Sequence, residues 1–332
     1  MLAKADHYFD ETFVSLIKFH TKEPNTLKGI EGGIFMLTNH LDFRLEPQIQ
    51  KLYEEHKKRS EKIDWGYHEF LPWDKAQDFR RVPWDSSQVT LPANIITAVE
   101  TALLTEVNLP WFTSHLDQTF KGPLTVVRDF VHTWTAEEDQ HSNLLETYLL
   151  ITRSVDPKRL HQLHKQTVES GYSPDYTTPF ETMVYTTMQE LATMAFYTNV
   201  AKVARKHDSE LSTLLLRLSK DETLHYAFYR DVIKFHLQLE PNYCYYLGHV
   251  IRNFQMPGAV MPDFDDRMAI IAKEANYGPL EYFDQVLEVI IDYWDIENLR
   301  PIAPEAEAAR VDILKYRDRM KKVRDRFYKK NK

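Results

Sequence analysis

The 332-residue sequence contains little cysteine, little glycine and no long apolar run. The single cysteine, Cys244, excludes a disulfide framework, and it excludes a cysteine-ligated iron–sulfur cluster because such a cluster needs about four thiolates. No stretch approaches the roughly 18 consecutive apolar residues of a membrane span, and the N-terminal MLAKADHYFDETF lacks the apolar segment of a signal peptide. We therefore expect a soluble, cytoplasmic protein.

Positive charge is also in deficit. The chain has 41 Lys and Arg against 49 Asp and Glu, a formal net charge of -8, which argues against a general nucleic-acid binder. The exception is the C-terminal segment 315–332, KYRDRMKKVRDRFYKKNK, with ten Lys or Arg against two Asp. Two interpretations of this basic tail stay open: a solvated, fraying end, or a docking surface for an acidic partner.

The pattern of apolar residues predicts an all-α protein, because they recur at helical spacing over most of a chain with only 9 glycines. Thr178-Pro179-Phe180-Glu181 marks a helix start, with a cap, a first-turn proline and a reciprocating glutamate. No low-complexity linker interrupts the chain, so we expect one domain over 45–314, preceded by an arm of uncertain structure (1–44) and followed by the basic tail. Helices are expected near 45–58, 90–105, 123–151, 178–205, 209–237, 264–275, 280–294 and 303–325.

One of these predicted helices carries charge on its apolar face. In WTAEEDQHSNLLETYLLI (134–151) the helical period places Glu138 and His141 on the same side as Leu145 and Tyr148. Buried charge is costly unless it is paired or bound to a metal. The segment therefore requires a partner elsewhere in the chain.

That partner is a second copy of the same spacing. Of the 14 histidines, only His141 and His225 have a glutamate three residues before them. Two further glutamates complete the repeat, so that one constant shift of 84 residues relates the two halves. The first half consists of Glu106, Glu138 and His141, and the second of Glu190, Glu222 and His225.

These six side chains form the ligand set of a four-helix, carboxylate-bridged dimetal site, in which two helices give one Glu each and two give Glu-x-x-His. Four carboxylates balance two divalent cations, which makes their burial tolerable, and the mixed oxygen and nitrogen donors suit iron or manganese. We therefore predict metal binding by Glu106, Glu138, His141, Glu190, Glu222 and His225.

Neighbouring residues extend the predicted site. Glu137 and Asp221 occupy equivalent positions, each just before a ligand glutamate, where a carboxylate can accept the spare N–H of a histidine from the opposite half. The alternative for both is a solvated helix charge. Thr193 lies one turn after Glu190, where its hydroxyl either faces the metal site or bonds back to its own helix.

At these residues the sequence resembles the soluble acyl-acyl-carrier-protein desaturases, the family of the plant stearoyl-carrier-protein desaturases and their actinobacterial relatives. The likeness spans about residues 45 to 300. The motifs that carry it, in family order, are LEPQIQKLYEEH (45–56), WGYHEFLPWD (65–74), LLTEVNLPWF (103–112), WTAEEDQH (134–141), TRSVDP (152–157), QELAT (189–193), DETLH (221–225) and FQMPG (254–258).

The resemblance implies a homodimer with a ferritin-like four-helix bundle core and additional surrounding helices. It implies a di-iron site made by the six ligands, with Thr193 beside the oxygen site and with Trp65 and Asp221 carrying electrons toward His141. The implied reaction is the O₂-dependent insertion of a double bond into a saturated fatty acyl chain held on acyl carrier protein. Because no Gly-x-Gly-x-x-Gly occurs, electrons are expected from outside the protein, and the resemblance implies a ferredoxin-type donor.

Departures from the family keep alternatives open. His115, Gln118 and Thr119 stand at positions that shape the acyl pocket in the family, where relatives often carry apolar groups. They either face the pocket, which would favour a shorter or more polar substrate, or point to solvent or to a neighbouring helix. Tyr197 replaces a common histidine. A di-iron hydroxylase or N-oxygenase acting on another substrate is one alternative. An iron-storage or structural metalloprotein is another, although the chain is about twice as long as a bare four-helix bundle needs to be. A radical-generating subunit would require a tyrosine beside the metals.

Overall fold

The structure is a computed structural model that describes residues 40–122, 124–172, 174–176 and 178–330. Within these ranges the chain is helical and contains no strand. The main helices are α2 (Glu46–Ser60), α3 (Ala93–Glu106), α4 (Leu109–Thr119), α5 (Thr125–Ile151), α6 (Pro157–Ser170), α7 (Pro179–Ala204), α8 (Ser209–Leu239), α9 (Cys244–Asn253), α10 (Phe264–Glu274), α11 (Pro279–Tyr282), α12 (Glu288–Tyr293) and α13 (Pro304–Lys330). A π-helical segment, Phe283–Leu287, joins α11 to α12, and short 3-10 helices lie at Phe43–Leu45, Tyr67–Phe70, Trp73–Lys75, Ser86–Gln88, Pro241–Tyr243 and Pro257–Val260.

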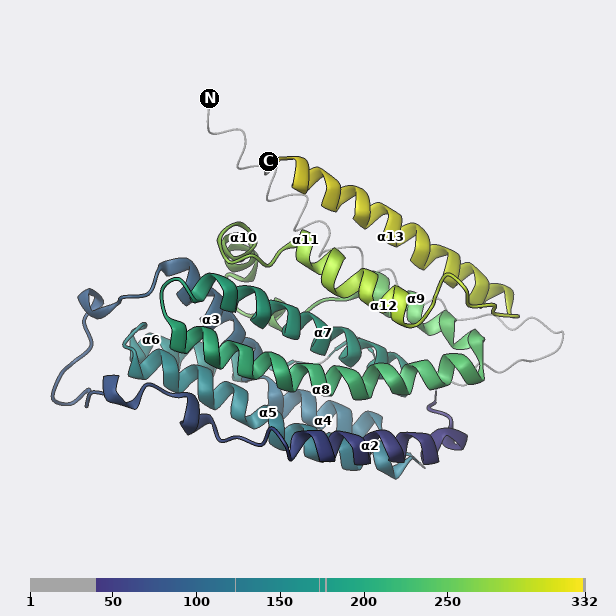
Figure 1. The fold of residues 1–332 in the computed structure, drawn as a ribbon, viewed down its shortest axis with the longest axis horizontal. Coiled ribbons are helices and arrows are strands. Elements are labelled where there is room, and N and C mark those ends of the chain that lie inside the picture. Colours follow the sequence, from purple (N-terminus) through teal and green to yellow (C-terminus); the bar gives the residue numbers. More distant parts are fainter. Residues whose placement is uncertain (1–39, 123, 173, 177, 331–332) are drawn as a thin grey trace.

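Four of these helices form the core of the molecule. Helices α7 and α8 pack along much of their length, α3 packs on α5, and cross-contacts join α3 to α7 and α5 to α8. Figure 1 shows this bundle with α2 on one side and α9 to α13 on the other. The all-α prediction and the four-helix core are thus confirmed. None of the described helices is long and apolar enough to cross a bilayer.

Local sequence signals explain where the bundle helices begin. The Thr178 hydroxyl accepts a hydrogen bond from the backbone N–H of Glu181 at 3.3 Å, which confirms the predicted start of α7. Asp208 accepts from the backbone N–H groups of Glu210 and Leu211 at 2.8 and 2.9 Å, which caps α8 only four residues after α7 ends. The short connection makes α7 and α8 antiparallel neighbours.

The eight predicted helices are present with boundaries shifted by a few residues, and three further helices were not predicted. These are α4, α6 and α9. Pro110 and Pro157 each lie in the first turn of their helix, where the missing N–H has no intrahelical partner to lose. Asp156 caps α6 by accepting from the backbone N–H of Lys158 at 2.9 Å.

The basic C-terminal segment does not fray within the described residues. It continues α13 to Lys330, and the helix packs on α9 and α11. The approach to α9 is close, since a Cβ placed on Gly248 would lie 3.1 Å from Cβ of Ala309. Ile313 and Met320 are buried on the inner face of α13, so packing holds the helix in place. Most of the predicted N-terminal arm, residues 1–39, lies outside the described residues.

Candidate metal centre

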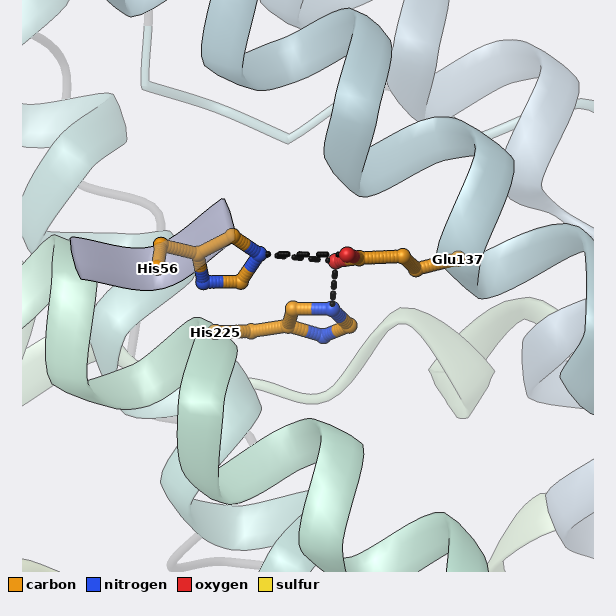
Figure 2. A group of neighbouring side chains, drawn as sticks. All are labelled: His56, Glu137 and His225. Atoms are coloured by element: carbon orange, nitrogen blue, oxygen red, sulfur yellow. Dashed lines mark hydrogen bonds and ion pairs between the residues drawn. The ribbon is translucent and has the colours of Figure 1, made fainter. Parts of the chain in front are cut away.

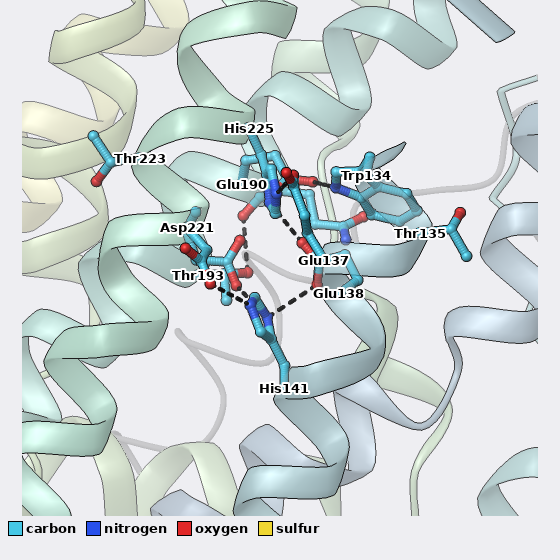
Figure 3. Close-up of polar contacts among 12 residues, drawn as sticks. Trp134, Thr135, Glu137, Glu138, His141, Glu190, Thr193, Asp221, Thr223 and His225 are labelled. Atoms are coloured by element: carbon cyan, nitrogen blue, oxygen red, sulfur yellow. Dashed lines mark hydrogen bonds and ion pairs between the residues drawn. The ribbon is translucent and has the colours of Figure 1, made fainter. Parts of the chain in front are cut away.

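The six predicted ligands converge in the middle of the bundle. Glu106 is the last residue of α3, Glu190 lies on α7, and α5 and α8 each supply a Glu-x-x-His pair, which helical spacing places on one face. Figure 3 shows that Glu138, His141, Glu190 and His225 point toward a common centre. Five of the six residues are no more than 5% exposed, and the Glu106 side chain is 11% exposed.

The donor atoms form two groups that share ligands. His141 Nδ1 lies 3.0 Å from Glu138 Oε2 and 3.3 Å from Glu222 Oε1, with Glu106 Oε2 at 4.0 Å. On the other side, His225 Nδ1 lies 2.7 Å from Glu138 Oε1 and 3.4 Å from Glu190 Oε2. Each oxygen of Glu138 thus lies against one of the two imidazoles. Both groups of donor atoms include Glu138 and Glu222. These two carboxylates would therefore be shared by both ions of a metal pair.

Several of these buried donor atoms have no hydrogen bond within the described part of the chain. They include one oxygen each of Glu138, Glu190 and Glu222, and the Nδ1 atoms of both histidines. A buried polar atom left without a partner costs about 1–3 kcal/mol. Two divalent cations would satisfy all of them and neutralise the four carboxylates, so the residues present fit a metal pair.

The charges of the cluster are strongly coupled in the absence of metal. Burial, reinforced by Glu138, raises the pKa of Glu106 to about 7 and the pKa of Glu222 well above its ordinary value. Burial also opposes ionisation of Glu138, but the imidazoles outweigh it and lower its pKa to about 2. For His141 and His225, burial favours the neutral ring, yet the surrounding carboxylates, Glu138 foremost, raise both pKa values. Protons therefore occupy the cluster when metal does not.

The two outer carboxylates contact the histidines of opposite halves, where the sequence repeat predicts them. Glu137 Oε2 lies 2.9 Å from His225 Nε2, and Asp221 Oδ2 lies 3.5 Å from His141 Nε2. The Trp65 indole donates to Asp221 Oδ2 at 2.7 Å. A continuous path of contacts thus joins Trp65 through Asp221 to His141.

Four further residues that contact this cluster were not predicted. The Tyr197 hydroxyl donates to Glu106 Oε1, and the Trp134 indole donates to Glu190 Oε1 at 3.1 Å. His56 and Ser60, both on α2, contact Glu137. Two of them left a sequence signal, because Trp134 stands one turn before Glu138 and Tyr197 one turn after Thr193. The other contacts join separate helices.

The predicted catalytic threonine lies beside the cluster. The Thr193 hydroxyl donates to the carbonyl of Gln189 at 3.0 Å, so in this structure it bonds back to its own helix. Its side chain also lines a cavity of about 30 Å³ that is bounded by Phe112, Trp134 and Pro257 together with four of the proposed ligands. Thr193 therefore faces the space next to the metal centre.

The three residues predicted to shape a substrate pocket lie further out on α4. Gln118 is exposed, Thr119 is half-buried, and neither lines the small cavity. His115 is half-buried and its ring stacks on Phe112 with 6.3 Å between centroids. Leu109 and Phe112 are the residues of this helix that line the small cavity.

A bundle that buries four carboxylates and two imidazoles at these spacings defines a ferritin-like protein of the dimetal-carboxylate class. The chain belongs to the fatty acid desaturase family, whose sequence pattern matches residues 40–332.

Individual relatives agree with this assignment. The chain is 31% identical over 281 residues to a Mycobacterium tuberculosis protein named acyl-[acyl-carrier-protein] desaturase DesA1, covering 81% of this chain and 82% of that protein. It is 25% identical to the chloroplastic stearoyl-[acyl-carrier-protein] 9-desaturase of Spinacia oleracea, covering 79% and 70%. The solved structure of M. tuberculosis DesA2 shares the fold, with a TM-score of 0.61 at 22% identity over 80% of this chain and 99% of that one.

Proposed function

We propose that this protein is an acyl-[acyl-carrier-protein] desaturase with two iron ions. In the overall reaction, two hydrogen atoms leave adjacent methylenes of the acyl chain, two external electrons and two protons are supplied, and O₂ is reduced to two waters. The convergence of the six buried donors in a member of the desaturase family carries this proposal. Iron bound there would supply the redox chemistry with O₂.

The protein's own side chains prepare this centre. Glu138 and Glu222 belong to both donor groups and would contact both metal ions, and burial of the ligands excludes bulk water. The Trp134 indole holds one oxygen of Glu190, so that Oε2 faces His225. Phe112 and Pro257 give the adjoining cavity an apolar part of its wall, and Thr193 brings a hydroxyl to the same space.

The electron donor is proposed to be an external, ferredoxin-type protein. Trp65 and Asp221 line an open cavity at the surface, and Asp221 lies against His141. An electron delivered at this cavity would pass through Trp65 and Asp221 before it reaches His141. We also propose a homodimer in the cytoplasm.

The carrier protein is proposed to approach the basic face of α13. Lys315, Arg319, Lys322 and Arg326 follow one another at intervals of four, three and four residues, which places them on one face of the helix, and all four are exposed. An acidic carrier protein would complement this row.

The decisive experiment incubates the iron-loaded, reduced protein with stearoyl- or palmitoyl-carrier protein, O₂ and a ferredoxin system, and measures the acyl product by mass spectrometry. Desaturation gives a product lighter by two hydrogens. A product heavier by one oxygen would instead establish a hydroxylase. Absence of any product, with iron bound far above two per chain, would favour storage.

A further inference from the structure

The Glu137 carboxylate joins three helices at the edge of the metal centre. Figure 2 shows His56 from α2 and His225 from α8 pointing at Glu137 of α5. Glu137 Oε2 lies 2.9 Å from Nε2 of each ring, and Oε1 lies 3.3 Å from His56 Nε2. The Ser60 hydroxyl donates to Oε1. Glu137 thus accepts from three donors.

These contacts fix which nitrogen of each ring carries a proton. An ionised carboxylate can only accept hydrogen bonds, so both rings must donate Nε2–H to it. For His225, donation through Nε2 leaves the Nδ1 lone pair facing Glu138 and Glu190, as metal ligation requires.

His56 has no other polar role in the described structure. Its ring is 4% exposed, its Nδ1 has no hydrogen bond among the described residues, and its edge packs on Phe130. Burying a polar imidazole costs free energy of desolvation, and among the described residues Glu137 is its polar partner that offsets this cost. The buried position of His56 is therefore explained by its hydrogen bond to the Glu137 carboxylate.

The other half of the centre lacks this arrangement. Asp221, which the 84-residue shift relates to Glu137, is held instead by Trp65 and by the guanidinium of Arg217. It also lies farther from its histidine, at 3.5 Å from His141 against 2.9 Å for the contact between Glu137 and His225. The two halves are thus repeated in sequence but unequal in structure.

We propose that His56 is a positioning residue for the metal position at His225, and that it makes the two metal positions unequal in affinity. This inference rests on the proposed dimetal centre. Without His56, the Glu137 carboxylate accepts hydrogen bonds only from His225 and Ser60. It can then rotate toward the open cavity that it lines. Loss of such an outer contact typically weakens metal binding about 10–100-fold.

The test is a titration of metal-free protein with Co²⁺, followed by its d–d absorption. The wild-type protein is expected to bind two Co²⁺ per chain in two steps. His56→Ala should weaken one step about 10–100-fold and leave the other unchanged. His56→Gln should recover part of the loss, because its amide can donate to Glu137. His161→Ala, which removes an exposed histidine of α6, is the matched control.

A second measurement identifies the affected position. In the Co²⁺ protein, each ligand imidazole gives a paramagnetically shifted N–H proton signal, and the signal of His225 should exchange faster with water in His56→Ala. Ser60→Ala, expected to act in the same direction, replaces His56→Ala if that variant does not fold. Equal weakening of both steps, or no change in either, would overturn the inference. A wild-type protein that binds no Co²⁺ would overturn the metal centre itself.

Discussion

Tyr197 lies one turn beyond Thr193 on α7, and its hydroxyl donates to a proposed ligand, Glu106. Sequence alone gave no account of this tyrosine. In the structure the Tyr197 hydroxyl donates to one oxygen of the Glu106 carboxylate. The other oxygen, Oε2, is therefore the atom nearest His141. The same contact places a phenol beside the metal centre, which a radical-generating subunit requires.

Tyr197→Phe therefore separates two roles. If the tyrosine only orients Glu106, the variant should keep two bound metals, with the position beside His141 weakened about 10-fold in a Co²⁺ titration. Electron paramagnetic resonance of the oxidised iron protein should show no tyrosyl radical in either form. A radical signal in the wild type that disappears in Tyr197→Phe would contradict the orienting role and favour a radical-generating subunit.

His236 gives a pH dependence of stability away from the metal centre. Its Nδ1–H donates to the Val232 carbonyl at 2.7 Å, and its Nε2 accepts from the backbone N–H of Asp42 at 2.9 Å. Burial lowers its pKa from 6.5 to about 4. Between pH 4 and 6.5 the His236 imidazole is protonated in the unfolded chain but neutral in the folded protein. The free energy of unfolding is therefore highest above pH 6.5 and falls as the pH decreases toward 4.

The expected loss from this one group is up to about 3 kcal/mol in the free energy of unfolding. Urea unfolding at a series of pH values measures it. His236→Gln should be less stable at pH 7.5, and the stability difference from the wild type should shrink as pH falls toward 4. A difference that is independent of pH would show that His236 does not titrate in this way.

At the level of secondary-structure elements, α13 shows how packing changes the interpretation of a charged segment. Its sequence alone is compatible with a frayed tail, since the helix carries many like charges. Buried Ile313 and Met320 fix it against the body of the protein. The exposed cations are therefore held in a row rather than distributed over a mobile chain.

The row predicts a defect in carrier binding when its charge is reversed. Arg319→Glu with Lys322→Glu should raise KM for the acyl-carrier substrate about 10-fold and leave kcat nearly unchanged, because these exposed charges act on association with the carrier protein. Lys158→Glu with Lys206→Glu, which reverses two exposed lysines elsewhere, is the control. Equal KM values in the two double variants would place the carrier on another surface.

At the level of the whole molecule, the metal centre joins all four bundle helices, so metal binding is coupled to folding. Metal that binds only the folded state stabilises it by about 2.7 kcal/mol when its free concentration is 100 times Kd. Addition of Fe²⁺ under anaerobic conditions should therefore raise the melting temperature of the metal-free wild-type protein.

Glu222→Ala should lose bound metal, activity and this thermal shift together, since Glu222 belongs to both donor groups. Elemental analysis and scanning calorimetry measure the first and the last. Glu169→Ala, an exposed glutamate of α6, should retain all three. Two irons retained in Glu222→Ala would contradict its role as a ligand.

The sequence predicted most of the helices and the convergence of six donors, because both depend on spacing within single helices. The period that makes α5 and α8 amphipathic also places Glu138 with His141, and Glu222 with His225, on the buried face. Helices α4 and α6 were missed because a proline in the first turn has the same appearance in sequence as one that ends a helix.

The sequence by itself determined which residues are available to a metal pair, since a repeated pattern on four helices needs no knowledge of their packing. Only the tertiary structure decided what surrounds them. The contacts of His56 with Glu137 and of Tyr197 with Glu106 join separate helices, and Trp65 reaches Asp221 from a loop. Proximity across helices depends on how they pack, and no local spacing encodes it. The difference between the two halves of the centre therefore arises only on folding.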